Sequence, residues 1–170
     1  MTGDNLRTYR KHEKEEGMRF ESLEDALNFA RDKEQKANDI YTVFGQIVKS
    51  QAARKLLEEL AMQELRHRQM IEDVLTTGNV ANIGGKKKIE EVSFSDYMDP
   101  PADLDSNSNP QDVMAYALKM EQSAYDLYRD LLDNYADTEL QGLFARLAQE
   151  ELKHKQILEE QYEEHFMQWM

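Results

Sequence analysis

Two copies of a Glu-x-x-His motif carry the clearest chemical potential in this sequence. Glu64 stands three positions before His67, and Glu151 stands three positions before His154. Residues three apart lie on one face of a helix, so each motif would present a carboxylate and an imidazole in the same direction. Such a pair can bind a divalent metal ion. One copy alone is weak evidence, because the motif often occurs by chance.

Two further glutamates stand where apolar residues are expected. Glu34 falls in a series of apolar positions spaced by threes and fours, which is typical of the buried face of a helix. Glu121 interrupts a second series in the same way. The two Glu-x-x-His motifs interrupt a third and a fourth series. The series around Glu34 runs over positions 23, 27, 30, 34, 37, 41, 44 and 48. The series around Glu121 runs over positions 114, 117, 121, 124, 128, 131 and 135, and the series around Glu64 and His67 runs over positions 53, 57, 60, 64, 67, 71 and 74.

Polar residues at these positions have an ordinary explanation and a chemical one. A single buried Glu or His more often sets helix register or keeps partial contact with water than binds a metal. Four carboxylates gathered inside a bundle, however, would repel one another and lose hydration, which costs several kcal/mol per uncompensated ion. None of the six positions holds a basic Lys or Arg, and two divalent cations would balance the four negative charges. The sequence therefore predicts a dinuclear metal site formed by Glu34, Glu64, His67, Glu121, Glu151 and His154.

The elements that position these residues are two copies of one helical hairpin. Residues 22–75 align with residues 109–162 at a constant shift of 87 positions, with 15 identities in 54 positions. Candidate caps coincide too, since Ser22 corresponds to Asn109 and Ser50 corresponds to Asp137, and Gly78 is the expected end of the second helix. Short turns make the helices within a hairpin antiparallel, whereas the crossover 76–108 is long enough to return along the bundle. We therefore predict an all-α, ferritin-like four-helix bundle.

Composition narrows the function classes. The 170 residues include 34 acidic and 21 basic ones, a net charge of −13, which argues against nucleic acid as a partner. No stretch is apolar enough to span a bilayer, so we expect no membrane association. The absence of cysteine excludes disulfides, thiolate zinc sites and iron–sulfur clusters. The polar segment 1–21 does not resemble a secretory signal, so a cytoplasmic location is the default expectation, and residues 163–170 are interpreted as a C-terminal tail.

Other polar residues near the motifs have more ordinary interpretations. Tyr41 and Tyr128 each stand seven positions after a predicted glutamate ligand, where a phenol could hydrogen-bond a ligating carboxylate. An ordinary role as core aromatics remains the alternative. Glu59 and Glu150 fall outside the apolar series and are interpreted as surface charges.

At these residues the sequence resembles the rubrerythrin-type branch of the ferritin-like superfamily, over roughly 22–162. The resemblance rests on Glu34-x-x-Ala37-x-x-x-Tyr41 with Ala61-x-x-Glu64-x-x-His67, and on Glu121-x-x-Ala124-x-x-x-Tyr128 with Ala148-x-x-Glu151-x-x-His154. It implies a non-haem di-iron site that reacts with hydrogen peroxide or dioxygen, usually in a homodimer. In this resemblance Glu34 and Glu121 are single-carboxylate ligands, Glu64 and Glu151 bridge the metals, and His67 and His154 are terminal ligands.

Two departures from the family pattern bear on activity. Typical rubrerythrins carry another Glu three residues after the third-helix ligand, where this chain has Ala124. They also append a cysteine-bound rubredoxin domain, which a sequence without cysteine cannot form, so electrons would come from another protein. The expected function is peroxide or dioxygen reduction by two iron ions per chain. An iron-handling ferroxidase or storage protein, and a redox-silent structural module holding manganese or zinc, remain alternatives.

Overall fold

Four long helices make up the computed structural model, which describes residues 20–78, 97, 107–108 and 110–169. Most of the N-terminal segment 1–21 and of the crossover 76–108 lies outside the described residues. The helices are α2 (Leu23–Ile47), α3 (Gln51–Thr77), α5 (Pro110–Asn134) and α6 (Gln141–Trp169). The described residues form no strand, so the all-α prediction is confirmed. None of their helices is long and apolar enough to cross a membrane.

The first hairpin begins and ends at the residues that the sequence indicates. The Ser22 hydroxyl accepts a hydrogen bond of 3.1 Å from the backbone N–H of Asp25, which caps α2. Ser50 caps α3 in the same way, with 3.3 Å to the N–H of Ala53. Gly78 follows the last turn of α3, and its N–H donates to the Val74 carbonyl at 2.8 Å.

The second hairpin departs from the prediction at both ends of α6. Asp137 does not cap this helix, which begins four residues later at Gln141. The hydroxyl of Thr138 instead accepts a hydrogen bond of 3.3 Å from Leu140 N–H, and its carbonyl accepts one of 3.2 Å from Gln141 N–H. At the other end, α6 continues to Trp169, so helical backbone covers most of the segment interpreted as a tail.

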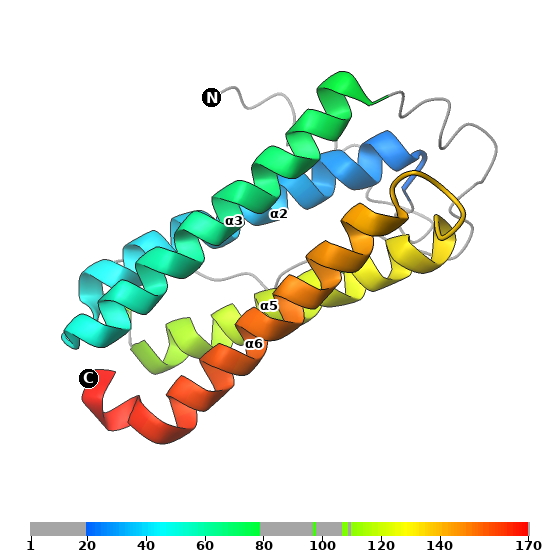
Figure 1. Cartoon of the computed structure of the whole chain (residues 1–170). Helices are drawn as coiled ribbons and strands as arrows, with labels where there is room; N and C mark the ends of the chain where they lie inside the picture. The colour runs from blue at the N-terminus through cyan, green and yellow to red at the C-terminus, as the bar shows by residue number, and fades with distance from the viewer. Residues whose placement is uncertain (1–19, 79–96, 98–106, 109, 170) are drawn as a thin grey trace, which may run out of the picture.

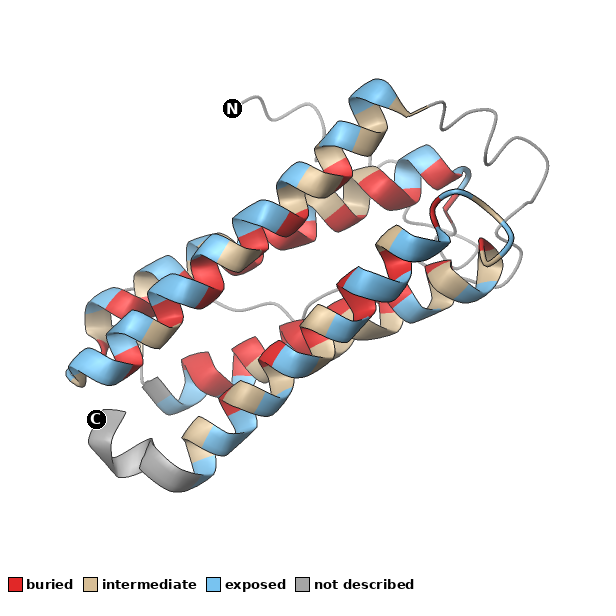
Figure 2. Ribbon diagram, viewed as in Figure 1, coloured by how far each residue is buried: buried red, intermediate tan, exposed pale blue. Residues whose placement is uncertain are grey.

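The two hairpins pack side by side (Figure 1). Helices α2 and α3 run in opposite directions, as do α5 and α6, whereas α3 and α5 run in the same direction (Figure 1). Helix α3 therefore ends at the opposite end of the bundle from the start of α5, as in the ferritin-like arrangement. Figure 2 shows buried residues on the faces that meet and exposed residues on the outer faces.

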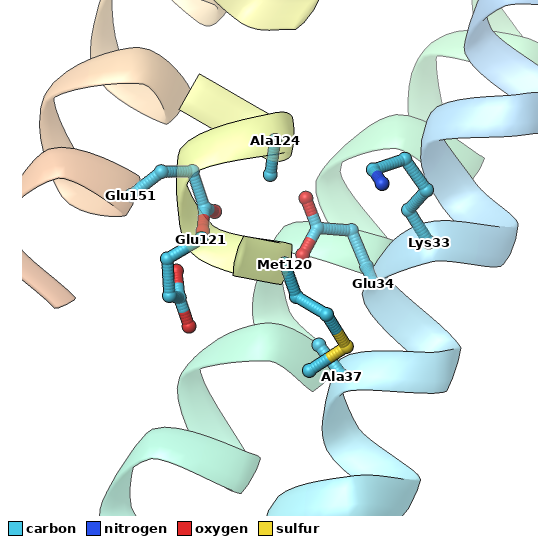
Figure 3. Close-up of a pocket in the computed structure, with 7 residues that line it drawn as sticks. All are labelled: Lys33, Glu34, Ala37, Met120, Glu121, Ala124 and Glu151. Atoms are coloured by element: carbon cyan, nitrogen blue, oxygen red, sulfur yellow. The ribbon is translucent and has the colours of Figure 1, made fainter. Parts of the chain in front are cut away.

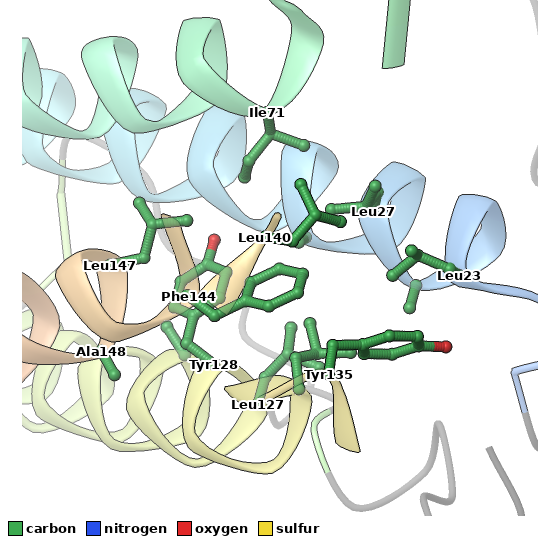
Figure 4. Close-up of a cluster of buried hydrophobic side chains, with 14 of the residues drawn as sticks. Leu23, Leu27, Ile71, Leu127, Tyr128, Tyr135, Leu140, Phe144, Leu147 and Ala148 are labelled. Atoms are coloured by element: carbon green, nitrogen blue, oxygen red, sulfur yellow. The ribbon is translucent and has the colours of Figure 1, made fainter. Parts of the chain in front are cut away.

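Two apolar clusters fill the bundle on either side of its middle. One contains Leu27, Ile71, Leu131 and Phe144, all fully buried, and Figure 4 shows most of its larger side chains. The other contains Phe44, Leu57, Leu60, Met114 and Leu158. Burying one such side chain contributes about 1.5–3 kcal/mol, so the clusters hold the four helices in register. On every helix, the residues that separate the clusters are the interrupting polar ones.

Candidate metal centre

All six predicted metal ligands meet at the middle of the bundle, and each is at most 2% exposed. One comes from α2 and one from α5, and α3 and α6 each supply a Glu and a His. Their positions follow from helix periodicity, because the apolar residues on either side force the same face inward. The six residues are Glu34, Glu64, His67, Glu121, Glu151 and His154.

The ligand atoms form two overlapping groups, each with all its atoms within 4.8 Å of one another. The first group joins Glu34 and His67, and the second joins Glu121 and His154. Both groups contain Glu64 and Glu151. The two shared carboxylates lie where a group could bridge two metal ions, which is the role that the resemblance implies for them.

The histidine Nδ1 atoms face the carboxylates across the bundle. Nδ1 of His67 lies 2.6 Å from Oε1 of Glu151 and 3.2 Å from Oε2 of Glu64. Nδ1 of His154 lies 2.7 Å from Oε1 of Glu64. The two imidazole rings are nearly parallel, with centroids 5.4 Å apart and an angle of 11° between them. Each ring therefore presents Nδ1 to the centre and Nε2 to the outside.

Several of these inward atoms lie close to one another but make no hydrogen bond of suitable geometry within the described part of the chain. They include Nδ1 of both histidines, both carboxylate oxygens of Glu64, Oε2 of Glu121 and Oε1 of Glu151. Buried polar atoms in native proteins are nearly always satisfied, so this many exceptions in one place require an explanation. Carboxylate oxygens and imidazole nitrogens are common ligands of divalent first-row metals. The donor set fits two such ions.

Burial controls the protonation of the cluster. It raises the pKa of Glu64 and Glu121 well above the ordinary value, and neighbouring carboxylates add to the shift. Burial, with repulsion from Glu34 and Glu64, raises the pKa of Glu151 to about 8. Burial opposes a charged His67, but contacts with Glu151, Glu34 and Glu64 outweigh it and raise the His67 pKa. At neutral pH the cluster therefore retains protons unless cations take their place.

Two tyrosines cross the bundle to the predicted single-carboxylate ligands. The hydroxyl of Tyr41 on α2 donates to Oε1 of Glu121 on α5. The hydroxyl of Tyr128 on α5 donates to Oε1 of Glu34 on α2. Both tyrosines are fully buried, so the hydrogen bonds are shielded from water and fix the orientation of the two carboxylates. Sequence spacing suggested that each tyrosine could hydrogen-bond a metal ligand. It did not show that the hydrogen-bonded glutamate belongs to the other hairpin.

The outer nitrogens of the histidines have acceptors that the sequence did not reveal. Nε2 of His67 lies 2.6 Å from Oε2 of Glu150, and Nε2 of His154 lies 2.7 Å from Oε1 of Gln63. The interpretation of Glu150 as a plain surface charge is therefore wrong, whereas Glu59 is exposed as expected. Arg146 also donates to Glu150, at 2.8 Å. Although partial burial opposes it, hydrogen bonds from Arg146 and His67 hold the pKa of Glu150 below its ordinary value.

Lys33 is a second residue that sequence periodicity missed. Its side chain is buried, and Nζ donates to the Tyr97 carbonyl at 2.9 Å and to the Ser123 hydroxyl at 3.0 Å. It stands next to Glu34 in the chain but outside the apolar series. The apolar periodicity of α2 alone does not predict this burial, because a residue of the crossover and residues of α5 cover the Lys33 side chain.

A small cavity adjoins the carboxylates between α2 and α5 (Figure 3). Its volume is about 10 Å³, close to the minimum that holds one water molecule. Ala37 and Ala124, at corresponding positions of the two hairpins, leave this space open. The lining residues are Lys33, Glu34, Ala37, Met120, Glu121, Ala124 and Glu151.

Comparisons with known proteins agree with this geometry. The family model described as rubrerythrin matches residues 25–162 of the chain. The fold is similar to the crystal structure of a protein from Thermotoga maritima that is described as a ferritin-like diiron-carboxylate protein. That similarity has a TM-score of 0.67 at 18% sequence identity and covers 88% of this chain and 99% of the other. The sequence has no significant match among curated proteins.

Proposed function

Because this chain belongs to the rubrerythrin family, we propose that it holds two iron ions in its glutamate and histidine cluster and reduces hydrogen peroxide or dioxygen. The six ligand residues support the first part of this proposal, since they supply four negative charges and two neutral nitrogens to two dications. Oxygen and nitrogen donors do not select iron over manganese or zinc by themselves. Membership of the rubrerythrin family supports iron as the metal.

The side chains around the cluster would hold the metals and orient their ligands. Glu64 and Glu151, which face both histidines, would bridge, while His67 and His154 would each bind one ion. Hydrogen bonds from the two tyrosines fix the remaining carboxylates. Two ferrous ions bound there would supply two electrons, which suffice to cleave the O–O bond of hydrogen peroxide or to reduce dioxygen to hydrogen peroxide. Reduction of hydrogen peroxide to two water molecules also consumes two protons, which come from solvent.

The size of the cavity is the observation that carries the choice of substrate. A space of about 10 Å³ beside Glu34, Glu121 and Glu151 is near the minimum that holds one water molecule, which supports a small oxidant over an organic substrate. Hydrogen peroxide and dioxygen are oxidants of this class. Ala124 adds no carboxylate on this side, so a redox-dependent switch between a Glu at this position and a His is unavailable.

Electrons must return to the site after each turnover. The chain contains no cysteine and so cannot form a cysteine-bound iron centre of its own. We propose a separate electron-donor protein as a partner, and a homodimer as the assembly. Each chain would carry a complete site, because all six ligand residues come from one chain.

Rapid mixing tests the proposed reaction. Protein loaded anaerobically with two ferrous ions is mixed with hydrogen peroxide or with dissolved dioxygen, and the ferric absorbance is followed. We expect oxidation much faster than that of aqueous ferrous ion, and recovery of the ferrous form after reduction. Oxidation no faster than free iron would contradict the proposal.

Size and iron content separate this function from iron storage. We expect a small assembly with about two irons per chain after repeated cycles of ferrous iron and oxidant. A large shell, or mineral far exceeding two irons per chain, would favour storage instead.

A further inference from the structure

The two histidines of the cluster differ in the group that accepts their outer N–H. His67 has the carboxylate of Glu150 at 2.6 Å, whereas His154 has the amide oxygen of Gln63 at 2.7 Å. Positions 63 and 150 correspond under the shift of 87 residues. The repeated backbone therefore places an acceptor at the same point on both sides, but the two acceptors are chemically different.

The direction of both hydrogen bonds follows from the position of the rings. Each Nδ1 faces the cluster of carboxylates, so the ring proton of a metal-binding imidazole would sit on Nε2. A carboxylate can only accept, and Gln63 must then present its oxygen and not its amino group. Both histidines donate outward.

The surroundings of Glu150 and Gln63 also differ in the next residue outward from the metal cluster. Arg146 donates to Glu150 at 2.8 Å, so the carboxylate that accepts from His67 is itself fixed by a cation. The corresponding residue of the first hairpin is Glu59, which is exposed and lies 3.9 Å from Lys55. Among the described residues no Lys or Arg donates to Gln63, although Arg66 and Lys153 line the same groove.

Acceptor charge changes the strength of a metal ligand. A hydrogen bond to a carboxylate is about twice as strong as one to a neutral acceptor, and it makes the imidazole a better electron donor. Removal of such an outer partner typically costs 10–100-fold in metal affinity. An amide gives a smaller effect because it carries no net charge.

We propose that Glu150 and Gln63 make the two metal positions inequivalent, and that the position ligated by His67 binds its ion more tightly and fills first. Glu150 and Gln63 act as positioning residues, since they reach the metal only through the histidines. The inference rests on the proposed metal site and deepens it, because it assigns an order of loading to the two ions.

Other features of the two metal positions are either the same at both positions or unchanged in every variant proposed below. Each histidine is 1% exposed, and each single-carboxylate ligand accepts one tyrosine hydroxyl. Lys33, beside Glu34, has Met120 as its counterpart, and its positive charge would weaken the His67 position. It is unchanged in every variant below, so it cannot produce a reversal of loading order.

Reciprocal exchange of the two acceptors is the direct test. Glu150→Gln, Gln63→Glu and the double exchange are nearly isosteric, and both side chains line a groove of about 160 Å³ between α3 and α6. Cobalt(II) alone is the probe. Proton NMR of paramagnetic Co(II) protein resolves the Nε2–H of each bound histidine, so signal intensity at one equivalent reports which position is occupied.

We expect the wild-type chain at one equivalent to show mainly one of the two N–H signals, with a preference of up to about tenfold. Glu150→Gln and Gln63→Glu should each reduce this preference to near equality, and the double exchange should favour the other signal. Glu59→Gln, an exposed substitution at the position matching Arg146, is the control and should match wild type. Circular dichroism verifies that each variant remains helical.

Two results would overturn the inference. One is equal occupancy of both positions in the wild-type chain at one equivalent of cobalt, whether the ions bind at random or two at a time. The other is the same favoured signal in wild type and in the double exchange. Failure of the metal site itself gives a different result, namely fewer than two cobalt ions bound per wild-type chain at saturation.

Discussion

The hydroxyl of Tyr41 on α2 donates a hydrogen bond to Glu121 on α5, across the interface between the two hairpins. The hydroxyl of Tyr128 on α5 donates the equivalent hydrogen bond to Glu34 on α2. The pair therefore links each half of the bundle to a predicted metal ligand of the other half. Folding of the interface and orientation of the ligands depend on the same two hydrogen bonds.

Loss of one phenol should weaken both metal binding and the fold. Tyr41→Phe keeps the buried ring but frees the Glu121 carboxylate, so we expect about a tenfold loss of affinity for the second metal ion. The free energy of unfolding should fall by about 1–3 kcal/mol. Cobalt titration and chemical denaturation measure the two effects.

Tyr135→Phe is the matched control. Tyr135 is also buried, but its hydroxyl has no hydrogen-bond partner among the described residues. Its removal should leave both quantities nearly unchanged. Equal effects of the two substitutions would show that Tyr41 acts only as a core aromatic.

Removal of both shared carboxylates should abolish metal binding without unfolding the bundle. Glu64 and Glu151 contribute to both ligand groups, so Glu64→Ala with Glu151→Ala leaves each position with one carboxylate and one imidazole. We expect the metal-free variant to be at least as stable as metal-free wild type, because two buried ionisable groups are gone. Thermal unfolding in chelator, followed by circular dichroism, measures this. A strongly destabilised variant would assign these glutamates a structural role.

Metal-free protein should lose stability as pH rises from about 5 to 8. Glu64, Glu121 and Glu151 have pKa values raised by burial, with Glu151 at about 8, so their protonated forms favour the folded state at low pH. That contribution is complete below the unfolded pKa of 4.5 and is lost as pH passes the folded pKa. The raised pKa of His67 acts in the same direction above 6.5.

One group opposes this trend. Burial lowers the pKa of His154, which adds stability as pH rises toward 6.5. The four groups above outweigh it, so the melting temperature in chelator should be lower at pH 8 than at pH 5. A melting temperature that is constant or higher at pH 8 would contradict the assigned protonation. Metal affinity should change in the opposite sense, since the ions displace protons.

The buried ammonium of Lys33 should stabilise the chain around Tyr97. Lys33→Met copies Met120, the corresponding residue of the second hairpin, and removes the hydrogen bonds to the Tyr97 carbonyl and the Ser123 hydroxyl. We expect the free energy of unfolding to fall by about 1–3 kcal/mol, the range for hydrogen bonds from a charged group, although the Ser123 hydroxyl still donates to the Tyr97 carbonyl at 2.8 Å. Denaturant titration measures the change. Unchanged stability would show that these contacts contribute little.

Sequence periodicity predicted the central residues because their burial depends on one helix at a time. Glu34 occupies a core position between Ala30 and Ala37, so the helix itself turns it inward. The repeat of 87 residues then paired it with Glu121. The same reasoning predicted the four-helix fold, since the apolar face of each helix must pack against the apolar face of another helix.

Residues whose roles depend on contacts between helices could not be found in this way. Glu150 lies on the solvent side of the α6 core series and meets His67 only because α3 packs opposite. Asp137 was expected to cap α6 because Ser50 caps α3, but the turn after Tyr135 is longer, and the Thr138 hydroxyl accepts from Leu140 N–H within that turn. Helix periodicity contains no information on which residues face each other across a groove, nor on the length of a turn.

Metal content of the wild-type chain is the measurement that tests the central claim most directly. Purified protein is stripped with chelator, loaded with ferrous iron without oxygen, passed through a desalting column and analysed for iron. We predict about two irons per wild-type chain and almost none in the variant with Glu64→Ala and Glu151→Ala. Fewer than about one iron per wild-type chain, or equal iron in both proteins, would contradict the di-iron site.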